Sequence, residues 1–523
     1  MGLRERLVLN ALSAGYAASL RPAHRRFLEG ARFPLRSQSR HLLDLLQRNA
    51  DTEFGRRHDF AGIVDVAGYQ ARVPLSTYED YEADIARIAD GTGGVLTDEP
   101  VLMLERTSGS TKGPKLIPYT KSLLSEFSSF TDPWLYDLFK TRPKLLGTTS
   151  YWSLSPAARA RETTAGGLPI GFRDDTEYFG PVSRFVLSRL MAVPGEVARL
   201  ELEAWRFETA RRLMEDERLG FISVWNPSFL SLLLDYIEAE REPLLASLTP
   251  ERRRAAQSAL RGPRLSVTEL WPRLVLVSAW ADGAAARPLA MLKERLFGIE
   301  VQAKGLLATE GAVSFPLLEH SAGAVVPASG PFLEFVDLDA EDRRPRLIHE
   351  LEVGGRYSPV LTTGGGFYRY RLMDELLCVG RHLGLPLVRF SGRLDQVSDL
   401  VGEKISAGEV EAALDEVRRQ LDLCPAFALL APVHAQPGRY ELYLEGVDAH
   451  AHEMAAEVEA KLLRGYHYRY ARDLGQLGSV RAVVVQDGAR RYLEALAADG
   501  VKLGDIKPSV LDRRTIWHEV FSS

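Results

Sequence analysis

A loop rich in hydroxyl groups and glycine stands between two short apolar segments, and its composition suits an anion. It reads TSGSTKGPK over residues 107–115. Glycine lets backbone N–H groups approach a ligand closely, the hydroxyl groups can donate hydrogen bonds, and lysine adds positive charge. We therefore predict a phosphate-binding loop whose contacts come from Thr107, Ser108, Gly109, Ser110, Thr111 and Lys112.

The spacing of this loop differs from the two commonest nucleotide-binding motifs. A P-loop has the pattern GxxxxGK[ST] with the lysine opening a helix, but counting from Gly109 puts Pro114 at the second glycine. The residues after Lys115 are apolar and read as a strand. A GxGxxG dinucleotide fingerprint directly after a strand is also missing. On residue types alone, a polar surface loop without a ligand remains an alternative.

The elements beside the loop must hold its two ends. Residues 101–105 read as a buried strand that enters the loop, and residues 116–118 as a second strand that leaves it. Thr120 has the residue type of an N-cap, so we expect a helix to begin there and to break at Pro133.

The remaining pattern predicts an α/β protein. Strands alternate with helices between about 220 and 311, which is typical of buried parallel strands. Residues 330–393 are rich in strands with glycine breaks, which indicates an antiparallel, barrel-like subdomain. We expect an N-terminal domain over residues 1–393, a compact α+β C-terminal domain over residues 394–523, and a hinge at about 393–396.

Composition narrows the classes of partner. The 523 residues are 46% apolar and 26% charged, with a net charge of only −5, so we expect no nucleic-acid partner. Two cysteines, Cys378 and Cys424, cannot form a disulfide framework, which favours a cytoplasmic protein. No stretch approaches the roughly 20 apolar residues of a membrane span, and the N-terminal segment reads as an amphipathic helix rather than a signal peptide. We expect no membrane partner, and a monomer rather than an oligomer.

Further motifs follow the loop in a fixed order. They are ATEG at 308–311, YRYRLMD at 368–374 and GRLD at 392–395. This succession resembles the adenylate-forming superfamily of acyl-CoA ligases, luciferases and peptide-synthetase adenylation domains. The segments WNPSFL, SAWADGAA, KGLLATEG, TTGGGFYRYRLMDE and HYRYARDLGQLG extend the resemblance over nearly the whole chain. There the sequence is most similar to bacterial members of the auxin-responsive acyl acid amido synthetase family.

The resemblance implies both a fold and a reaction. The fold is α/β, with a large N-terminal adenylate-forming domain of layered sheets plus a barrel-like subdomain, and a small mobile α+β C-terminal domain. The reaction uses ATP and Mg²⁺ to activate a carboxylic acid as an acyl-adenylate with release of pyrophosphate. The acyl group then passes to the amine of an amino acid or a related amine, and AMP leaves. An acyl-CoA or carrier-protein ligase with the same first step, and a non-catalytic acid- or nucleotide-binding protein, remain alternatives.

The matched motifs also imply roles for single residues around the nucleotide. Thr309 would face phosphate, and Glu310 would be a catalytic residue that binds Mg²⁺ or lies beside it, although on its own Glu310 could simply cap a turn. Asp374 would accept hydrogen bonds from both ribose hydroxyls, because its two oxygens can each accept one. The family tends to carry glycine before this aspartate, where this sequence has Met373. The geometry of that turn is therefore open.

Other implied roles concern the adenine and the moving domain. Tyr368 and Tyr370 would pack near adenine, unless these alternating aromatic residues belong to the core. Arg393, near AMP, and Asp395 match the hinge about which the C-terminal domain turns between the two half-reactions. Lys507 matches a catalytic lysine that reaches the adenylate, with a surface lysine as the alternative.

The substrate pocket is less specified by the sequence. We expect apolar and aromatic walls, and an aromatic or medium-chain acid. The candidate wall residues, each of which could equally fill a core, are Trp152, Trp225, Phe229 and Trp280. The amine must lose a proton before it attacks, and Asp282 and His467 are candidates for the base.

Overall fold

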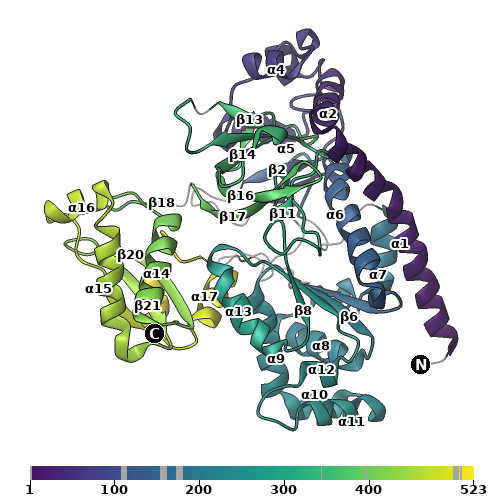
Figure 1. Ribbon diagram of the computed structural model, residues 1–523, viewed down its shortest axis with the longest axis vertical. Coiled ribbons are helices and arrows are strands. Elements are labelled where there is room, and N and C mark those ends of the chain that lie inside the picture. Colours follow the sequence, from purple (N-terminus) through teal and green to yellow (C-terminus); the bar gives the residue numbers. More distant parts are fainter. Residues whose placement is uncertain are drawn as a thin grey trace.

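The computed structural model describes residues 3–107, 115–153, 162–171, 181–342, 344–394, 397–498, 506 and 509–522. In Figure 1 the antiparallel strands of the central chain lie above a helix-covered parallel sheet, and the C-terminal elements lie to one side. The long helix α1 runs down the opposite side of the molecule. Among the described residues, no helix combines the length and apolar character that crossing a bilayer requires.

The parallel sheet confirms the alternation seen in the sequence. Its strands, in spatial order, are β3 (Thr149–Trp152), β6 (Leu219–Ser223), β7 (Leu276–Ala279) and β8 (Glu300–Ala303). All neighbouring pairs are parallel. The helices in this part of the chain are α8 (Leu202–Glu215), α9 (Pro227–Ala239), α10 (Arg241–Ser247), α11 (Pro250–Ala259), α12 (Val267–Leu270) and α13 (Ala286–Arg295). One core lies between the sheet and these helices, and the larger core lies on the sheet's other face.

The strand-rich region is an antiparallel sheet, as predicted. In spatial order its strands are β11 (Ala324–Val325), β17 (Leu385–Arg393), β16 (Asp374–His382), β14 (Arg356–Thr362), β12 (Phe332–Asp337) and β13 (Pro345–Leu347), with β15 (Tyr370–Arg371) on β14. Alternating burial along β16 places one face against the core. β16 and β17 form a hairpin that pairs Asp374 with Arg393 at one end and His382 with Leu385 at the other.

Helices cover the outer side of both sheets. They are α1 (Leu3–Arg32), α2 (Pro34–Arg48), α3 (Glu53–Arg57), α4 (Val66–Arg72), α5 (Glu82–Ala89), α6 (Lys121–Thr141) and α7 (Pro181–Leu190). Thr120 caps α6 by accepting a hydrogen bond from the Leu123 amide over 3.2 Å, as expected. The expected break at Pro133 is wrong, because α6 continues through it. Phe130 and Trp134 are buried on either side of the proline, and this packing compensates for the missing backbone hydrogen bond.

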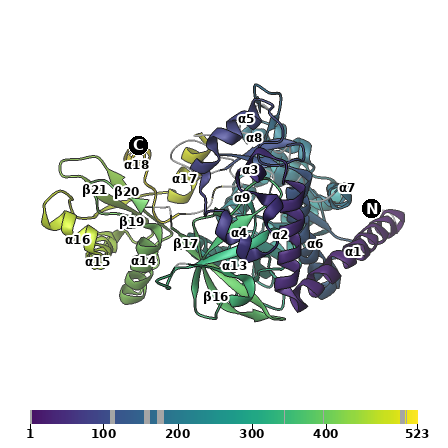
Figure 2. The same ribbon diagram turned by 90° about the horizontal axis from the view of Figure 1, so that it is seen from above.

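The C-terminal elements form a separate α+β arrangement. They are β18 (Val397–Ser398), β19 (Ile405–Ser406), α14 (Ala407–Leu421), β20 (Phe427–Val433), β21 (Arg439–Glu445), α15 (Ala451–Leu462), α16 (Tyr466–Asp473), β22 (Arg481–Val484), α17 (Gly488–Ala498) and α18 (Trp517–Ser522). The predicted helices and strands of this region are present, whereas α16 and α18 were not anticipated. Figure 2 shows α17 on the side that faces α9, with α15 and α16 on the far side.

Candidate active site

The predicted phosphate loop joins two antiparallel strands. β1 (Met103–Arg106) pairs with β2 (Leu116–Tyr119), which confirms the strands expected on either side of the loop. The Thr107 amide donates to the Lys115 carbonyl over 3.0 Å and closes the base of the loop. The Thr107 hydroxyl is buried and has no hydrogen-bond partner among the described residues. The loop residues predicted to contact phosphate, Ser108, Gly109, Ser110, Thr111 and Lys112, lie outside the described part of the chain.

Thr309 and Glu310 form the two-residue turn of a short hairpin beside this loop. The hairpin consists of β9 (Leu307–Ala308) and β10 (Gly311–Ala312). The Tyr119 hydroxyl, on β2, donates to the Thr309 carbonyl over 2.7 Å. The Tyr370 hydroxyl, on β15, donates to Glu310 Oε1 over 3.2 Å. The strand that leaves the loop and the strand of the tyrosine motif therefore fix the position of the turn from two sides.

The sequence did not predict this hairpin. The segment 300–311 reads as one strand, but β8 ends at Ala303. Gly305 then packs so closely that a Cβ atom there would lie 2.3 Å from the Ser314 carbonyl oxygen. Only glycine fits this approach, and the chain turns away from the parallel sheet at that point.

Tyr78 contacts the loop exit and lies near enough to Glu310 to feel its charge, and sequence reasoning missed it. Its hydroxyl accepts a hydrogen bond from the Leu116 amide over 2.8 Å, and Lys115 Nζ lies 5.4 Å from the centre of its ring. Burial raises the pKa of Tyr78, and the negative charge of Glu310 raises it further. Tyr78 lies 38 residues before Leu116, so no local pattern marks it.

Asp374 begins β16 and lies opposite Arg393, which ends β17. Arg393 Nε lies 3.6 Å from Asp374 Oδ1, and Asp374 is buried. Met373 has φ of +64°, the left-handed conformation that glycine adopts most easily. Met373 thus adopts a conformation that suits glycine, and its carbonyl accepts a hydrogen bond from the Leu394 amide over 2.7 Å. Asp395, predicted at the hinge, lies outside the described residues.

Tyr368 belongs to the core, which contradicts the prediction that it packs near adenine. Its side chain is fully buried, and its ring stacks on Phe54 with a centroid distance of 4.7 Å. Its hydroxyl donates to the Leu96 carbonyl over 2.8 Å. No part of this side chain is left for a ligand, because both the ring and the hydroxyl are engaged by the protein.

Arg369, the next residue of the motif, also points into the protein. Its guanidinium makes two hydrogen bonds of 3.0 Å to the carboxylate of Glu334, and both side chains are buried. It donates further to the Gln70 and Val73 carbonyls. This part of the motif therefore ties α4 to β12.

The aromatic residues predicted to line the acyl pocket divide between the two faces of the parallel sheet. Trp152 and Trp280 are buried in the larger core, where Trp152 packs edge-on against Trp134 of α6. Phe229 lies in the other core, against Trp205, so it is not part of the same wall. The reason is that Phe229 lies on α9, the helix after β6. The apolar side of α9 packs against the opposite surface of the sheet.

Lys304 stands beside these tryptophans and was not anticipated. It is only 8% exposed, and its Nζ donates to Ser223 Oγ over 2.7 Å. The same nitrogen lies 4.9 Å from the ring centre of Trp225 and 5.3 Å from that of Trp134, which are cation–π distances. Polar residues at every second position, Glu300, Gln302 and Lys304, were the available sequence signal for a polar face on this strand.

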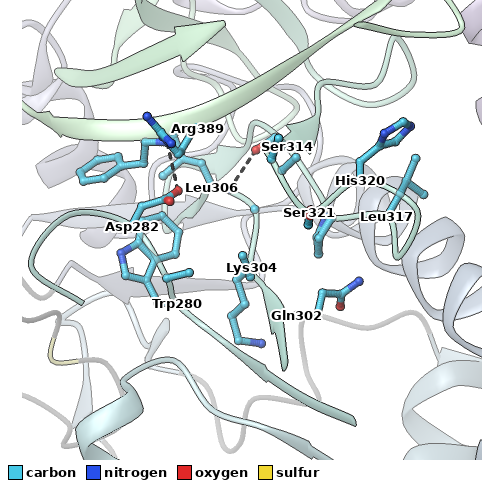
Figure 3. Close-up of a pocket in the computed structure, with 18 of the residues that line it drawn as sticks. Trp280, Asp282, Gln302, Lys304, Leu306, Ser314, Leu317, His320, Ser321 and Arg389 are labelled. Atoms are coloured by element: carbon cyan, nitrogen blue, oxygen red, sulfur yellow. Dashed lines mark hydrogen bonds between the residues drawn. The ribbon is translucent and has the colours of Figure 1, made fainter. Parts of the chain in front are cut away.

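A cavity of about 300 Å³ lies beside β8, the edge strand of the parallel sheet. In Figure 3 Trp280, Asp282 and Arg389 lie at one end, His320 lies at the other, and Lys304 is between them. Asp282 Oδ2 accepts a hydrogen bond from the Phe390 amide over 3.1 Å. Burial raises the pKa of Asp282 to about 6.

The two candidate bases differ in their surroundings. Asp282 lines the cavity, whereas His467 is exposed on α16, on the far side of the C-terminal elements. Asp282 also lies next to the C-terminal region, because a Cβ on Gly283 would stand 3.7 Å from both carboxylate oxygens of Glu411. The geometry favours Asp282 over His467.

Ile506, the described neighbour of Lys507, contacts the N-cap of α9. Lys507 itself lies outside the described residues, but the carbonyl of its neighbour Ile506 accepts a hydrogen bond from Asn226 Nδ2 over 3.1 Å. Asn226 is buried and also caps α9 by accepting a hydrogen bond from the Ser228 amide. This contact joins the C-terminal segment to the end of β6.

Models of one family match three segments of the chain. The GH3 family N-terminal domain matches residues 23–256, the central domain residues 324–393 and the C-terminal domain residues 408–515. The chain is 26% identical over 480 residues to a protein named probable indole-3-acetic acid-amido synthetase GH3.12 from Oryza sativa subsp. japonica, with 77% of each chain covered. It is 24% identical over 465 residues to a jasmonoyl–L-amino acid synthetase, JAR4, from Nicotiana attenuata, with 78% of each covered.

Solved structures show the same fold. GH3.15 acyl acid amido synthetase in complex with 2,4-DB matches with a TM-score of 0.81 at 20% identity, and 95% of each chain is covered. A second structure of GH3.15 matches with a TM-score of 0.79. The family models together span more than half of the chain, in the order of the motifs described above. The chain belongs to the GH3 family.

Proposed function

We propose that this protein is an ATP-dependent acyl acid amido synthetase. It activates a carboxylic acid as an acyl-adenylate with release of pyrophosphate, and then transfers the acyl group to the amine of an amino acid or a related amine, releasing AMP. It is thus a ligase that forms carbon–nitrogen bonds. The proposal is supported by membership of the GH3 family, whose curated relatives are named as amido synthetases.

The observation that carries the proposal is the meeting of three separate motifs at one place. The strand after the phosphate loop contacts Thr309 through Tyr119, and the tyrosine motif contacts Glu310 through Tyr370. Asp374 follows Tyr370 by four residues, so it lies within about 14 Å of it along the chain. The proposed ribose ligand thus follows closely, along the chain, a residue that contacts Glu310, so phosphate and ribose ligands can belong to one site.

Each residue then has a defined part in the first half-reaction. The loop of residues 107–112 would hold the phosphates, with the unpartnered Thr107 hydroxyl as one donor at its base. The Thr309 hydroxyl would contact phosphate, and the Asp374 carboxylate would accept hydrogen bonds from the ribose. The loop residues and the Thr309 hydroxyl would act as donors that neutralise the charge that develops when a carboxylate attacks the α-phosphate.

The residues present fit Mg²⁺. Glu310 offers a carboxylate that is 9% exposed, and Tyr370 occupies one of its oxygens with a hydrogen bond, so acceptor capacity remains. Carboxylate oxygen is the ligand type that Mg²⁺ prefers. When bound, the ion would supply positive charge at the phosphates, and Glu310 would hold it there.

The second half-reaction needs a base and a change of domain position. Asp282 has a carboxylate with a pKa raised to about 6, so it is ionised at pH 7.5 and can accept a proton from the amine. We place the N-terminal domain at residues 1–393, the C-terminal domain at residues 394–523 and the hinge at residues 393–396. Rotation about this hinge would move Lys507 out of the active site and form the site for the amine. The contact of Ile506 with Asn226 joins the two proposed domains, and such a rotation would break it.

The acyl pocket lies beside Trp152, Trp225 and Trp280 in this proposal. Trp225 is half-buried, and Lys304 stands between its ring and that of Trp134. Aromatic walls with one buried cation suit an acid that has an aromatic or medium-length apolar body. We also propose a cytoplasmic, monomeric enzyme that acts on small molecules and has no nucleic-acid or membrane partner.

An ATP–pyrophosphate exchange assay over a panel of carboxylic acids tests the first step. Exchange that depends on one class of acid supports the proposal, and exchange with no acid on the panel contradicts it. AMP release on addition of amino acids, with no response to CoA, then selects the amido synthetase over a CoA ligase. The reverse acceptor preference would assign the protein to the CoA ligases.

A further inference from the structure

A cluster of two histidines and a glutamate lies away from the nucleotide site. His320 Nε2 is 2.7 Å from His382 Nδ1. Glu319 Oε1 is 3.6 Å from His382 Nδ1 and 3.9 Å from His320 Nε2. One ligand atom from each residue therefore lies within 4.8 Å of the other two, a spacing that allows all three to bind one metal ion.

We propose that Glu319, His320 and His382 form a binding site for a borderline divalent transition-metal ion, with Zn²⁺ as the best match. Imidazole nitrogen and carboxylate oxygen are the ligands that Zn²⁺ accepts besides thiolate. Three protein ligands leave one tetrahedral position for solvent, and Glu319 is 60% exposed, so water can reach the site.

The geometry requires only a small adjustment. In a tetrahedral site with Zn–N distances of about 2.0–2.1 Å, two ligand nitrogens stand about 3.3 Å apart. The present separation of 2.7 Å is a hydrogen bond between two imidazoles, in which at least one nitrogen must carry a lone pair. Replacing the shared proton by a metal ion opens this contact by about 0.6 Å, which rotation of the exposed Glu319–His320 loop can supply.

The surrounding elements hold the ligands from different parts of the chain. His382 is the last residue of β16 and its ring lies parallel to that of Phe27 on α1, at 6.3 Å between centroids. Glu319 and His320 lie in the loop between β10 and β11. A third imidazole, His24 on α1, is close enough that its charge and that of His382 oppose each other, and its Nδ1 is buried without a hydrogen-bond partner among the described residues.

The site is distinct from the proposed nucleotide site. Asp374 and His382 are the first and last residues of β16, which puts them about 25 Å apart along an extended strand. His320 also lines the cavity described above, at the end opposite Asp282. The ion would therefore tie the cavity-lining loop to the β16–β17 hairpin rather than take part in adenylation.

Metal titration of tag-free, chelator-treated full-length protein tests the proposal. We expect one equivalent of Co²⁺ per chain with the intense visible bands of four-coordinate cobalt, displaced by Zn²⁺, and a Tm that rises with Zn²⁺. His320→Gln and His382→Gln should each weaken Zn²⁺ binding on the order of 100-fold, and Glu319→Gln on the order of 10-fold. His434→Gln, an exposed histidine outside the cluster, is the matched control and should bind as the parent does.

The outcomes separate a metal site from a simple hydrogen-bonded pair. Glu319 is exposed, so its variant should keep the parent's near-UV circular dichroism, and a loss of affinity there cannot be attributed to misfolding. If the parent binds Co²⁺ or Zn²⁺ no more tightly than the His320→Gln/His382→Gln double variant, the proposal is overturned. None of these readouts depends on catalysis, so failure here leaves the proposed ligase activity unaffected.

Discussion

The Tyr370 hydroxyl donates a hydrogen bond to Glu310 Oε1 over 3.2 Å, and this contact joins two motifs that lie 60 residues apart in the chain. Tyr370 is itself fixed, because its backbone pairs with β14 and its ring stacks on Phe367. The carboxylate is therefore held in place before any ligand binds. Such preorganisation is what a site for Mg²⁺ and phosphate requires.

Removing the charge of Glu310 should suppress the first half-reaction. Glu310→Gln keeps the size of the side chain but offers a weaker ligand, and we expect pyrophosphate exchange to fall on the order of 100-fold or more. Tyr370→Phe should instead raise the Mg²⁺ concentration needed for half-maximal exchange on the order of 10-fold, because it removes only an orienting hydrogen bond. Glu341→Gln, at an exposed position, is the control. An unchanged exchange rate in Glu310→Gln would remove this residue from the site.

Asp374→Ala should raise the KM for ATP in exchange on the order of 100-fold or more while leaving the KM for the acid nearly unchanged. The reason is that the carboxylate is proposed to accept both ribose hydroxyls, worth about 1.5–3 kcal/mol for each hydrogen bond to a charged group. Arg393→Met removes the partner of Asp374 and serves as the comparison. Equal effects on the two KM values would point to a general distortion of β16 instead.

The buried pair of Arg369 and Glu334 should matter for stability and not for catalysis. Arg369→Met leaves the Glu334 carboxylate buried without its main partner, and we expect a loss of about 3–5 kcal/mol in the free energy of unfolding. Breaking the exposed pair of Arg87 and Glu53 should cost at most about 1 kcal/mol. Urea unfolding of Arg369→Met and Arg87→Met measures the difference, and similar midpoints for both variants would contradict it.

Two half-buried carboxyl groups, those of Glu411 and Asp282, should make the stability depend on pH. Burial raises the pKa of Glu411 to about 7, and the charges of Asp415 and Asp282 add to the shift. Its pKa in the folded protein is above that in the unfolded chain, so the folded state binds the proton more tightly and this group's stabilising contribution is lost as pH rises from about 4.5 through 7. Asp282, with its pKa raised to about 6, acts in the same direction.

Glu411→Gln should therefore flatten this pH dependence. At pH 8 we expect the variant to be more stable than the parent by about 1–3 kcal/mol, with no advantage below pH 4.5. Urea unfolding at pH 5 and pH 8 tests this, with the exposed Glu519→Gln as the control. A variant that loses as much stability as the parent between these pH values would show that Glu411 is not the titrating group.

Local patterns in the sequence predicted the elements but not all of their contacts. The alternation of strands and helices gave the parallel sheet, and the hydroxyl of Thr120 marked the start of α6. The continuity of α6 through Pro133 and the turn at Thr309 depend on packing against distant residues. These contacts leave no periodic signal in the sequence. Whether a helix breaks or a strand ends at a given residue depends on the distant residues that pack against it.

The same limit applies to the candidate site. Asp374 and Glu310 carry a recognisable motif, whereas Tyr368 lies in the same motif and is core. The motif fixes residue types without fixing which side chains face the ligand. Tyr78 and Lys304 reach the region from other segments, so only the folded structure could identify them.

The end of β17, where the chain enters the C-terminal region, makes two contacts with residues at the start of β16. Leu394 donates its amide to the Met373 carbonyl, and Arg393 faces the Asp374 carboxylate. In the proposed mechanism, a ribose bound to Asp374 would compete with Arg393 for its carboxylate, and rotation of the C-terminal region would pull the Leu394 amide from the Met373 carbonyl. Binding of the ribose and the orientation of the C-terminal region would then be coupled. Release of AMP would return the enzyme to the state that accepts the next acid.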